Sequence, residues 1–492
     1  MSRLPVSYHV ELVEFFVRET LPARMAFVRG RQEASASSAP RLPHPIGHVH
    51  LLLRDDQGRK AFGCAGDYLS VRWLDKRPGR SDALKLRELS ALLNRAAEYQ
   101  LTDPSFDCVF DRWRVGHSRL LAFGREMGQE DLTSNFVSAL IERALLDAIC
   151  RLEDKSLFDL VRADRLGFRP DQVHDELSSI QIAELMASRP ATRFGIRHTV
   201  GLADPLLQAD VNPDVRINDG EPETLEEYLR RDGLEFFKIK VGGQLEEDLD
   251  RLARIWSVLA PAHPRGITID ANEAFENPEV LTEFVRRLGE DLPDFFNRVL
   301  YLEQPVPRAQ TLDSRHAEVI RRLSEVKPII IDEADSEVDS FKRARRLGYR
   351  GTSHKNCKGF FKSLLNFCLV AHWRGQGEEV FLSAEDLMNM PLVPLHQDFV
   401  SLGVLGLTQC ERNGHHYNYG LSMLSAKEKR EVEKWHQDLY VRRDGEWFLN
   451  ISRGAVECAS LQCPGYGVRG EPDWATMTEL GKWLECRYPA GD

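Results

Sequence analysis

Residues 266–304 decide the fold, and they read GITIDANEAFENPEVLTEFVRRLGEDLPDFFNRVLYLEQ. Two short apolar runs, at 266–270 and 298–304, flank a segment at 279–292 in which apolar residues recur at helical spacing. The apolar runs are nearly continuous and have polar residues mainly at their ends, as in parallel strands buried on both faces. The stretch therefore predicts a strand–helix–strand unit.

The same unit repeats between about residue 195 and residue 425. Eight short, β-rich runs alternate there with amphipathic helical segments, which is typical of a (β/α)8 barrel. The eight runs are 195–202, 236–241, 266–270, 298–304, 327–333, 351–356, 379–385 and 407–412. The sequence therefore predicts an α/β fold of the TIM-barrel type.

The regions on either side have a different pattern. Residues 1–190 mix strands with helices, including a strand at 48–56 and one long, half-buried helix at 136–161. Residues 426–492 are too few to stand alone, so we expect them to pack back onto the N-terminal domain. The predicted organisation is an α+β domain over 1–190, the barrel over 191–425 and a C-terminal segment over 426–492.

Composition excludes several classes of protein. The 492 residues, 42% hydrophobic and 29% charged, carry 65 basic and 76 acidic side chains, a net charge of −11 that argues against a nucleic-acid partner. No run reaches the ~18 apolar residues of a membrane span, and Glu11 and Glu14 interrupt the apolar run that a signal peptide would need. Nine cysteines without a C-x-x-C spacing suit reduced thiols. We expect a cytoplasmic protein without nucleic-acid or membrane partners.

Ionisable residues recur where successive barrel strands are expected to end. The strand ends of a (β/α)8 barrel converge on one mouth, where active sites lie. Any one of these residues could be a helix cap or a solvated charge, but the ordered set is hard to obtain by chance. Its members are Lys238, Lys240, Asp270, Glu303, Asp332, Glu333 and Lys355.

This set indicates metal-assisted proton transfer. Three carboxylates from three adjacent strands can surround one hard cation such as Mg²⁺, with Mn²⁺ as a possible substitute. Lysines on opposite sides of that cation can act as general bases once their pKa values are lowered. Lys238 and Lys240 are two residues apart on one strand and therefore share a face, so we expect each ammonium to disfavour protonation of the other.

Five motifs carry a resemblance to a known family. Together they resemble the ordered signature of the muconate-lactonizing subgroup of the enolase superfamily, in the mandelate racemase/muconate-lactonizing family. The motifs are FFKIKVGG (236–243), ITIDANEAF (267–275), YLEQPV (301–306), IIIDEAD (329–335) and SHKNCKG (353–359). The resemblance implies a TIM barrel with an α+β N-terminal capping domain that the C-terminal segment completes. It also implies a Mg²⁺-dependent lyase or isomerase.

The resemblance also implies roles for individual residues. The metal ligands would be Asp270, Glu303 and Asp332. Lys240 would be the base on one face of the substrate, with Lys238 lowering its pKa, and Lys355 would act on the opposite face. The remaining candidates are Glu333 near the metal, and Asn272 and Gln304 lining the site.

Some features depart from the family pattern or are weaker signals. After Lys355 the family usually has a glycine pair two residues past a second basic residue, whereas this chain has Lys358, Gly359 and then the bulky Phe360 and Phe361. Residues 410–420 lack the D-x-D of dipeptide epimerases. An insertion at 208–224 follows the first strand. Further candidates are His415 and His416, which could touch substrate, and Glu385 with Asp386, for which a helix cap is the favoured interpretation.

The segment 21–32, LPARMAFVRGRQ, matches the position of the family's substrate-gating loop. We therefore expect residues 20–45 to close over the barrel mouth, which the barrel's own loops leave open to water. Limited proteolysis should then cut around Ala34–Ala39 in the free enzyme, and substrate with Mg²⁺ should protect these residues.

The predicted reaction is abstraction of the proton next to a substrate carboxylate, through an enediolate. Racemisation or epimerisation, water elimination or cycloisomerisation could follow. The expected partner is a small-molecule carboxylate, and we expect a homo-oligomer. Two other classes stay open: a Schiff-base aldolase using a barrel lysine such as Lys355, and a non-catalytic barrel that binds a partner. The aldolase would not need Asp270, Glu303 and Asp332 together.

Overall fold

Long antiparallel strands form the core of the N-terminal domain. The computed structural model describes residues 7–25 and 42–489, and its first sheet has the order β16-β1-β2-β3, with β4 also pairing with β1. Helix α5 packs across β2 and β3, with α3 and α4 beside it. The elements are β1 (Tyr8–Pro22), β2 (Pro43–Asp55), β3 (Lys60–Tyr68), α2 (Val71–Leu74), α3 (Asp82–Thr102), β4 (Ser105–Phe106), α4 (Val109–Glu126), α5 (Asp131–Leu152), α6 (Leu157–Arg162) and α7 (Ile182–Leu185).

The helix predicted over 136–161 is two helices, α5 and α6. Asp154 takes a left-handed backbone conformation after α5, and the Ser156 side chain caps the N-terminus of α6. Helix α5 is also buried on almost every side rather than on one face, because it lies between the sheet, the neighbouring helices and a barrel loop. This position brings the N-terminal domain into contact with the barrel mouth.

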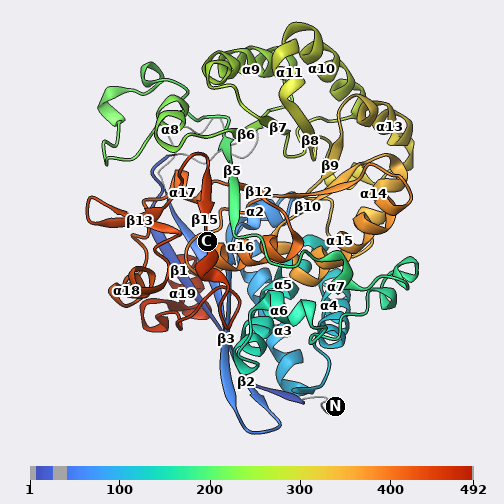
Figure 1. The fold of residues 1–492 in the computed structure, drawn as a ribbon, viewed down its shortest axis with the longest axis vertical. Helices are drawn as coiled ribbons and strands as arrows, with labels where there is room; N and C mark the ends of the chain where they lie inside the picture. Colours follow the sequence, from blue (N-terminus) through green and yellow to red (C-terminus); the bar gives the residue numbers. More distant parts are fainter. Residues whose placement is uncertain (1–6, 26–41, 490–492) are drawn as a thin grey trace.

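Eight parallel strands form the barrel, each close to one of the eight predicted runs (Figure 1). Their order is β11-β10-β9-β8-β7-β6-β5-β12, all parallel, so the barrel is nearly closed. The strands are β5 (Arg193–Val200), β6 (Phe236–Lys240), β7 (Gly266–Asp270), β8 (Val299–Glu303), β9 (Ile329–Ile331), β10 (Gly351–His354), β11 (Phe381–Ala384) and β12 (Gln409–Arg412). The predicted TIM barrel is confirmed.

Helices connect the strands and cover the outside of the barrel. In Figure 1 the run from α9 to α14 follows its upper and right-hand rim. Their apolar faces supply the core, for example Leu252 and Ile255 of α9 and Phe284 and Leu288 of α10. The helices are α8 (Leu225–Asp232), α9 (Leu245–Leu259), α10 (Pro278–Asp291), α11 (Pro293–Arg298), α12 (Arg308–Thr311), α13 (Ala317–Val326), α14 (Ser340–Leu347), α15 (Phe360–Gly375), α16 (Val393–Leu405) and α17 (Gly414–Tyr417).

The C-terminal segment joins both parts of the molecule. Its last strand, β16, pairs with β1 through Phe16 and Val17, and α19 packs on α3 and β1. Strand β15 instead runs antiparallel to the start of the barrel strand β5. Its elements are α18 (Ala426–Trp435), β13 (Tyr440–Arg443), β14 (Glu446–Leu449), β15 (Ala455–Glu457), β16 (Thr478–Glu479) and α19 (Leu480–Arg487). The boundaries at 190 and 425 stay predictions.

Two properties of the described residues concern membrane spans and disulfide bonds. No helix within residues 7–25 and 42–489 is long and apolar enough to cross a bilayer. All nine cysteines lie in this part of the chain, and none of them forms a disulfide.

Candidate active site at the barrel mouth

The three predicted metal-binding carboxylates come from adjacent strands at one end of the barrel. Asp270 and Glu303 are the last residues of β7 and β8 and lie opposite each other in the strand register. Asp332 directly follows β9. All three side chains are buried, with at most 1% of their surface exposed. The carboxyl ends of parallel barrel strands thus gather three negative charges in one place.

Two lysines from β6 reach these carboxylates. Lys238 Nζ lies 2.9 Å from Asp270 Oδ2 and 2.7 Å from Glu303 Oε2. Lys240 Nζ lies 2.5 Å from the same Asp270 oxygen and 2.7 Å from Asn272 Oδ1. The two ammonium groups therefore share one carboxylate oxygen, in agreement with the alternation of side chains along a strand.

Lys238 is surrounded by carboxylates beyond those predicted. Its ammonium also donates to Glu385 Oε2 at 2.8 Å and to Glu411 Oε2 at 3.0 Å. Burial alone would lower the pKa of Lys238, but the carboxylates, with Asp270 first, raise it well above the usual value. The lysine expected to lower the pKa of its neighbour is thus held protonated here by four acidic groups.

A third lysine approaches from the opposite side of the barrel. Lys355, directly after β10, places Nζ 2.6 Å from Asp332 Oδ2 and 4.6 Å from the ring centre of Trp73. Burial would lower its pKa, but the attraction of Asp332 outweighs burial and raises it. Lys358 binds the other Asp332 oxygen at 3.1 Å. Strands β6 and β10 are separated by the three carboxylate-bearing strands, so Lys240 and Lys355 flank the acidic group.

The chemistry of the mouth decides whether it could hold a hard divalent cation. Among the described residues, no group of three or more acidic, histidine or cysteine side chains is arranged to hold a metal ion, and lysines bind oxygens of Asp270, Glu303 and Asp332. Burial, and then repulsion from Asp270, raises the pKa of Glu303 well above its usual value. A buried oxygen-only set whose negative charges repel one another is what Mg²⁺ would stabilise.

The other three residues predicted near the metal differ in position. Glu333 accepts hydrogen bonds from Asn272 Nδ2 at 3.0 Å and from Trp73 Nε1 at 2.9 Å, so it lies at the mouth. Burial, and then repulsion from Asp332, raises the pKa of Glu333 to about 7. Gln304 is different: its amide accepts from the backbone of Asp332 and donates to the carbonyl of Val306.

Gln304 therefore braces the ends of β8 and β9 directly behind Asp332, and its expected place lining the site stays a prediction. Its side chain is fully buried, and its backbone lies in the left-handed region at φ 36°. Asn272 and Glu273, after β7, have φ values of 42° and 71°. Left-handed residues other than glycine are costly, and they cluster at functional sites.

His415 and His416 lie in α17, which follows β12. They belong to a ring cluster with His198 and Tyr228, whose centres are 4.7 Å apart. His416 Nε2 is also 3.3 Å from Asp204 Oδ2. In the described part of the chain, no hydrogen bond or ring contact joins either histidine to the lysines or carboxylates of the mouth. Their expected contact with substrate stays a prediction.

Sequence reasoning missed three residues of the site and favoured a helix cap for a fourth, Glu385. Glu385 follows β11 and Glu411 is the last residue but one of β12, so the rule that identified the other acids could have placed both at the mouth. Glu385 binds Lys238 and Arg197 and is not a helix cap, whereas Asp386 accepts from the backbone N–H groups of Asn389 and Asn413. The other two missed residues are Lys358 and Trp73.

Trp73 belongs to α2 of the N-terminal domain, and Arg308 holds it at the mouth. The Arg308 guanidinium donates to both Glu273 oxygens at 2.9 Å and to the backbone oxygens of Trp73 and Leu74. It also binds Glu130 at 2.9 Å. One barrel side chain thus joins two segments of the N-terminal domain to the loop after β7.

Arg308→Ala should therefore destabilise the protein. Loss of the guanidinium leaves Glu273 and the carbonyl of Trp73 without this partner, and breaking a largely buried ion pair costs about 3 kcal/mol. The free energy of unfolding, from urea denaturation, measures the effect. Arg315→Ala is the control. Arg315 also pairs with a carboxylate, that of Asp313, but its side chain is 84% exposed, so loss of this pair should cost little. Equal losses of unfolding free energy in Arg308→Ala and Arg315→Ala would contradict the stabilising role assigned to Arg308.

Much of the predicted gating segment lies outside the described residues, which omit 26–41. Its described start is held at the mouth by Arg24, which is 4% exposed. Arg24 binds Asp219 of the 208–224 insertion through two bonds of 2.5 and 2.6 Å, and donates to the carbonyl of His416. The insertion thus positions the chain immediately before residue 26, while gating itself stays a prediction.

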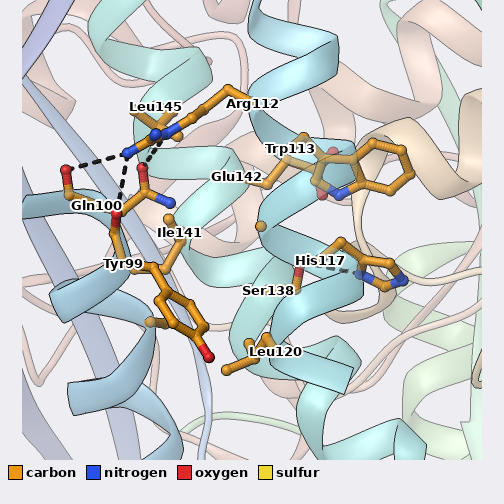
Figure 2. A pocket seen from close by; sticks show the side chains of 12 residues that line it. Tyr99, Gln100, Arg112, Trp113, His117, Leu120, Ser138, Ile141, Glu142 and Leu145 are labelled. Carbon is orange, nitrogen blue, oxygen red and sulfur yellow. Dashed lines mark hydrogen bonds between the residues drawn. The ribbon is translucent and has the colours of Figure 1, made fainter. Parts of the chain in front are cut away.

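A second polar cluster lies between the N-terminal helices and the loop after Lys355. Figure 2 shows Glu142, Trp113 and His117 around a small cavity between α3, α4 and α5. The fully buried Glu142 accepts from the backbone N–H of Phe361 at 2.5 Å, at the start of α15. Phe361 also packs against Trp113 and Phe110. The two phenylalanines that depart from the family pattern are thus part of the domain contact.

Glu142→Gln should change how stability depends on pH. Burial raises the pKa of Glu142 to about 8, from an ordinary value of 4.5. Between these values the folded protein holds a proton that the unfolded chain has lost, so stability falls as pH rises, by about 1.4 kcal/mol per unit. Glutamine keeps the acceptor for Phe361 and does not titrate. Between pH 4.5 and pH 8 the melting temperature should fall less in Glu142→Gln than in the wild type. Equal falls in the two proteins would contradict a titrating Glu142.

Comparisons with known proteins agree with this architecture. The family described as Enolase C-terminal domain-like matches residues 222–351. The comparison with curated proteins found no match.

Three solved structures illustrate the likeness in fold. A mandelate racemase/muconate lactonizing enzyme from Bordetella bronchiseptica RB50 is 15% identical, with a TM-score of 0.57 over 94% of this chain and 98% of that one. A muconate cycloisomerase variant is 13% identical, with a TM-score of 0.54 over 98% and 99%. A dipeptide epimerase from Enterococcus faecalis V583, complexed with Mg and the dipeptide L-Leu-L-Tyr, is 12% identical, with a TM-score of 0.56 over 94% and 100%. The family match thus covers the part of the barrel from α8 to the start of β10, and the three solved structures share the fold of the chain.

Proposed function

We propose that the protein is a divalent-metal-dependent enzyme that removes the proton from the carbon next to a substrate carboxylate. One observation carries the proposal: three buried carboxylates, Asp270, Glu303 and Asp332, lie between lysines from opposite sides of the barrel. Proton removal creates a second negative charge on the substrate, which has to be stabilised as it forms. A divalent cation on these carboxylates would supply that stabilisation as a Lewis acid.

The chain's own residues supply the proton transfer and the shape of the site. Lys240 and Lys355 each face the space between them from one side, so each would take or return a proton on one face of the substrate. Asn272 holds Lys240 at 2.7 Å, and Asp332 holds Lys355 at 2.6 Å. The ring of Trp73 lies against Lys355 and closes the mouth on the side of the N-terminal domain.

The end of β12 bears on the class of substrate. Glu411 accepts from Thr199 at 2.6 Å and from Lys238 at 3.0 Å, so both of its oxygens already have partners inside the barrel. With Arg412 and Asn413 after it, this strand end offers no pair of free carboxylates to a substrate ammonium group. This supports a carboxylic acid other than a dipeptide, with racemisation, elimination or cycloisomerisation as the subsequent step.

A turnover screen tests the proposal. Carboxylic and sugar acids, each beside its uncharged amide, are incubated with the enzyme and Mg²⁺, and parallel samples contain EDTA. Turnover is expected with acids only and should be lost in EDTA, since the amide lacks the charged oxygens that a cation would bind. Equal turnover of an acid and its amide would count against the proposal. A substrate adduct trapped by borohydride at Lys355 would favour the Schiff-base alternative.

A further inference from the structure

A chain of hydrogen bonds joins one lysine of the mouth to the N-terminal domain. Lys240 Nζ donates to Asn272 Oδ1 at 2.7 Å, and Asn272 Nδ2 donates to Glu333 Oε1 at 3.0 Å. The same Glu333 oxygen accepts from the indole N–H of Trp73 at 2.9 Å. Because Trp73 belongs to α2 and Lys240 to β6, these bonds connect the N-terminal domain with the barrel.

The second lysine of the mouth lies against the face of the same indole ring. Lys355 Nζ is 4.6 Å from the ring centre of Trp73, within the range of a cation–π contact. Tryptophan can make both contacts, because its ring edge carries one N–H donor and its face attracts a cation. One side chain of the N-terminal domain therefore contacts Lys355 directly and reaches Lys240 through two residues.

The amide of Asn272 has only one orientation that fits its neighbours. A lysine ammonium can only donate, so the amide has to turn its oxygen to Lys240, which leaves its nitrogen for Glu333. Asn272 also donates its backbone N–H to Asp270 Oδ1 at 2.8 Å. An amide oxygen accepts from a neutral amine as well as from an ammonium. Asn272 can therefore hold Lys240 both before and after a proton transfer.

Burial and the backbone keep these contacts in place. Trp73 is 5% exposed and Glu333 is 1% exposed, so their hydrogen bond lies in an interior of low dielectric, where such bonds are stronger than in water. The carbonyl of Trp73 accepts from Arg308, and Asn272 has the left-handed φ of 42° that its surroundings have to maintain. Misplacing a reacting group by about 1 Å can cost about 100-fold in rate. Contacts that fix a lysine therefore bear on the rate.

We propose that Trp73 is a positioning residue for both proton-transfer lysines. Its ring face orients Lys355. Its indole N–H orients Lys240 through Glu333 and Asn272. This role rests on the proposed function, in which the two lysines act on opposite faces of the substrate. It makes the position of the N-terminal domain a part of the proton transfer on both faces.

Trp73→Phe separates the two contacts, because phenylalanine keeps a ring face for Lys355 but lacks the N–H that Glu333 accepts. The measurement is α-proton exchange of each stereoisomer in D2O, with kcat and KM determined separately. For the stereoisomer that needs Lys240, kcat should fall by about 10–100-fold while KM stays near the wild-type value. The other stereoisomer should be affected much less. Trp73→Leu removes both contacts and should lower kcat for both stereoisomers.

Trp483→Phe is the matched control. Trp483 is 6% exposed and also donates its indole N–H to a glutamate, Glu19, at 3.1 Å. It lies in α19, and this bond does not lead to a lysine of the mouth. The variant should exchange both stereoisomers at the wild-type rate. Circular dichroism verifies that each variant is folded.

NMR of the indole N–H groups tests the contacts without a substrate. In protein labelled with 15N in its tryptophan side chains, the signal that Trp73→Phe lacks belongs to Trp73. Asn272→Ala removes the second donor to Glu333 Oε1, and Lys355→Ala removes the charge over the ring, so each should shift this signal. Lys482→Ala changes an exposed lysine of α19 and should leave the signal in place.

The two measurements distinguish failure of this role from failure of the proposed function. If the wild type exchanges and Trp73→Phe exchanges both stereoisomers at the wild-type rate, the positioning role is overturned and the function stands. Equal losses for both stereoisomers in Trp73→Phe would overturn the separate action of ring face and N–H. An indole signal that neither Asn272→Ala nor Lys355→Ala shifts would overturn the role whatever the reaction. If the wild type exchanges no acid, the proposed function fails, and the role of Trp73 in proton transfer fails with it.

Discussion

Asp270→Asn, Glu303→Gln and Asp332→Asn are each expected to weaken Mg²⁺ binding severely and to abolish most of the activity. Each change removes a carboxylate, one of the three proposed oxygen ligands, from a buried group. Loss of a residue that only supports a metal ligand already costs about 10–100-fold, so loss of a ligand should cost at least about 100-fold. Isothermal titration with Mg²⁺ measures the affinity.

The control for this series is Glu379→Gln, an exposed carboxylate in the loop before β11. Glu379→Gln removes one negative charge from the barrel but changes no residue of the mouth. The variant should therefore bind Mg²⁺ with the affinity of the wild type. Circular dichroism verifies folding, since Asp332 also holds Lys355 and Lys358. Wild-type Mg²⁺ affinity in all three mouth variants would show that these carboxylates do not bind the metal.

Lys240→Ala and Lys355→Ala should each abolish proton exchange for one configuration of the substrate. The two lysines approach from β6 and β10 on opposite sides of the carboxylates, so each can reach the α-proton from one face only. A general base contributes about 10²–10⁴-fold, and the loss should be of that order or larger. NMR of each stereoisomer in D2O measures the exchange.

The control is Lys482→Ala, whose lysine is 74% exposed at the start of α19. It should exchange both stereoisomers at the wild-type rate. If both mouth variants also exchange at that rate, neither lysine is a base. If Lys240→Ala and Lys355→Ala lose the same stereoisomer, the lysines do not act on opposite faces.

The barrel could be predicted because its strands leave a simple pattern in the sequence. Strands buried on both faces, such as β7 and β9, are continuous apolar runs that end in an acid or a base at the mouth. The ordered ends therefore predicted Asp270, Glu303 and Asp332 together with the lysines. The break between α5 and α6 was missed because the apolar spacing continues through the turn at Asp154.

Other parts of the site depend on contacts between distant segments. Trp73 lies far from Lys355 in the sequence, and only the packing of α2 against the barrel brings the two together. Gln304 follows a strand like a residue that lines a site, but its left-handed backbone turns the amide toward neighbouring backbone groups. The pKa of Lys238 depends on Glu385 and Glu411 from two further strands. A linear pattern does not contain these relations.

Exchange of the α-proton with solvent is a direct test of metal-assisted proton removal. Carboxylic and sugar acids are incubated with the wild-type enzyme and Mg²⁺ in D2O, and NMR follows the hydrogen at the α-carbon of substrate and product. Deuterium is expected at that carbon for at least one acid, and none when EDTA replaces Mg²⁺. Conversion of an acid that leaves its α-hydrogen in place, or exchange that continues unchanged in EDTA, would contradict metal-assisted removal of the α-proton.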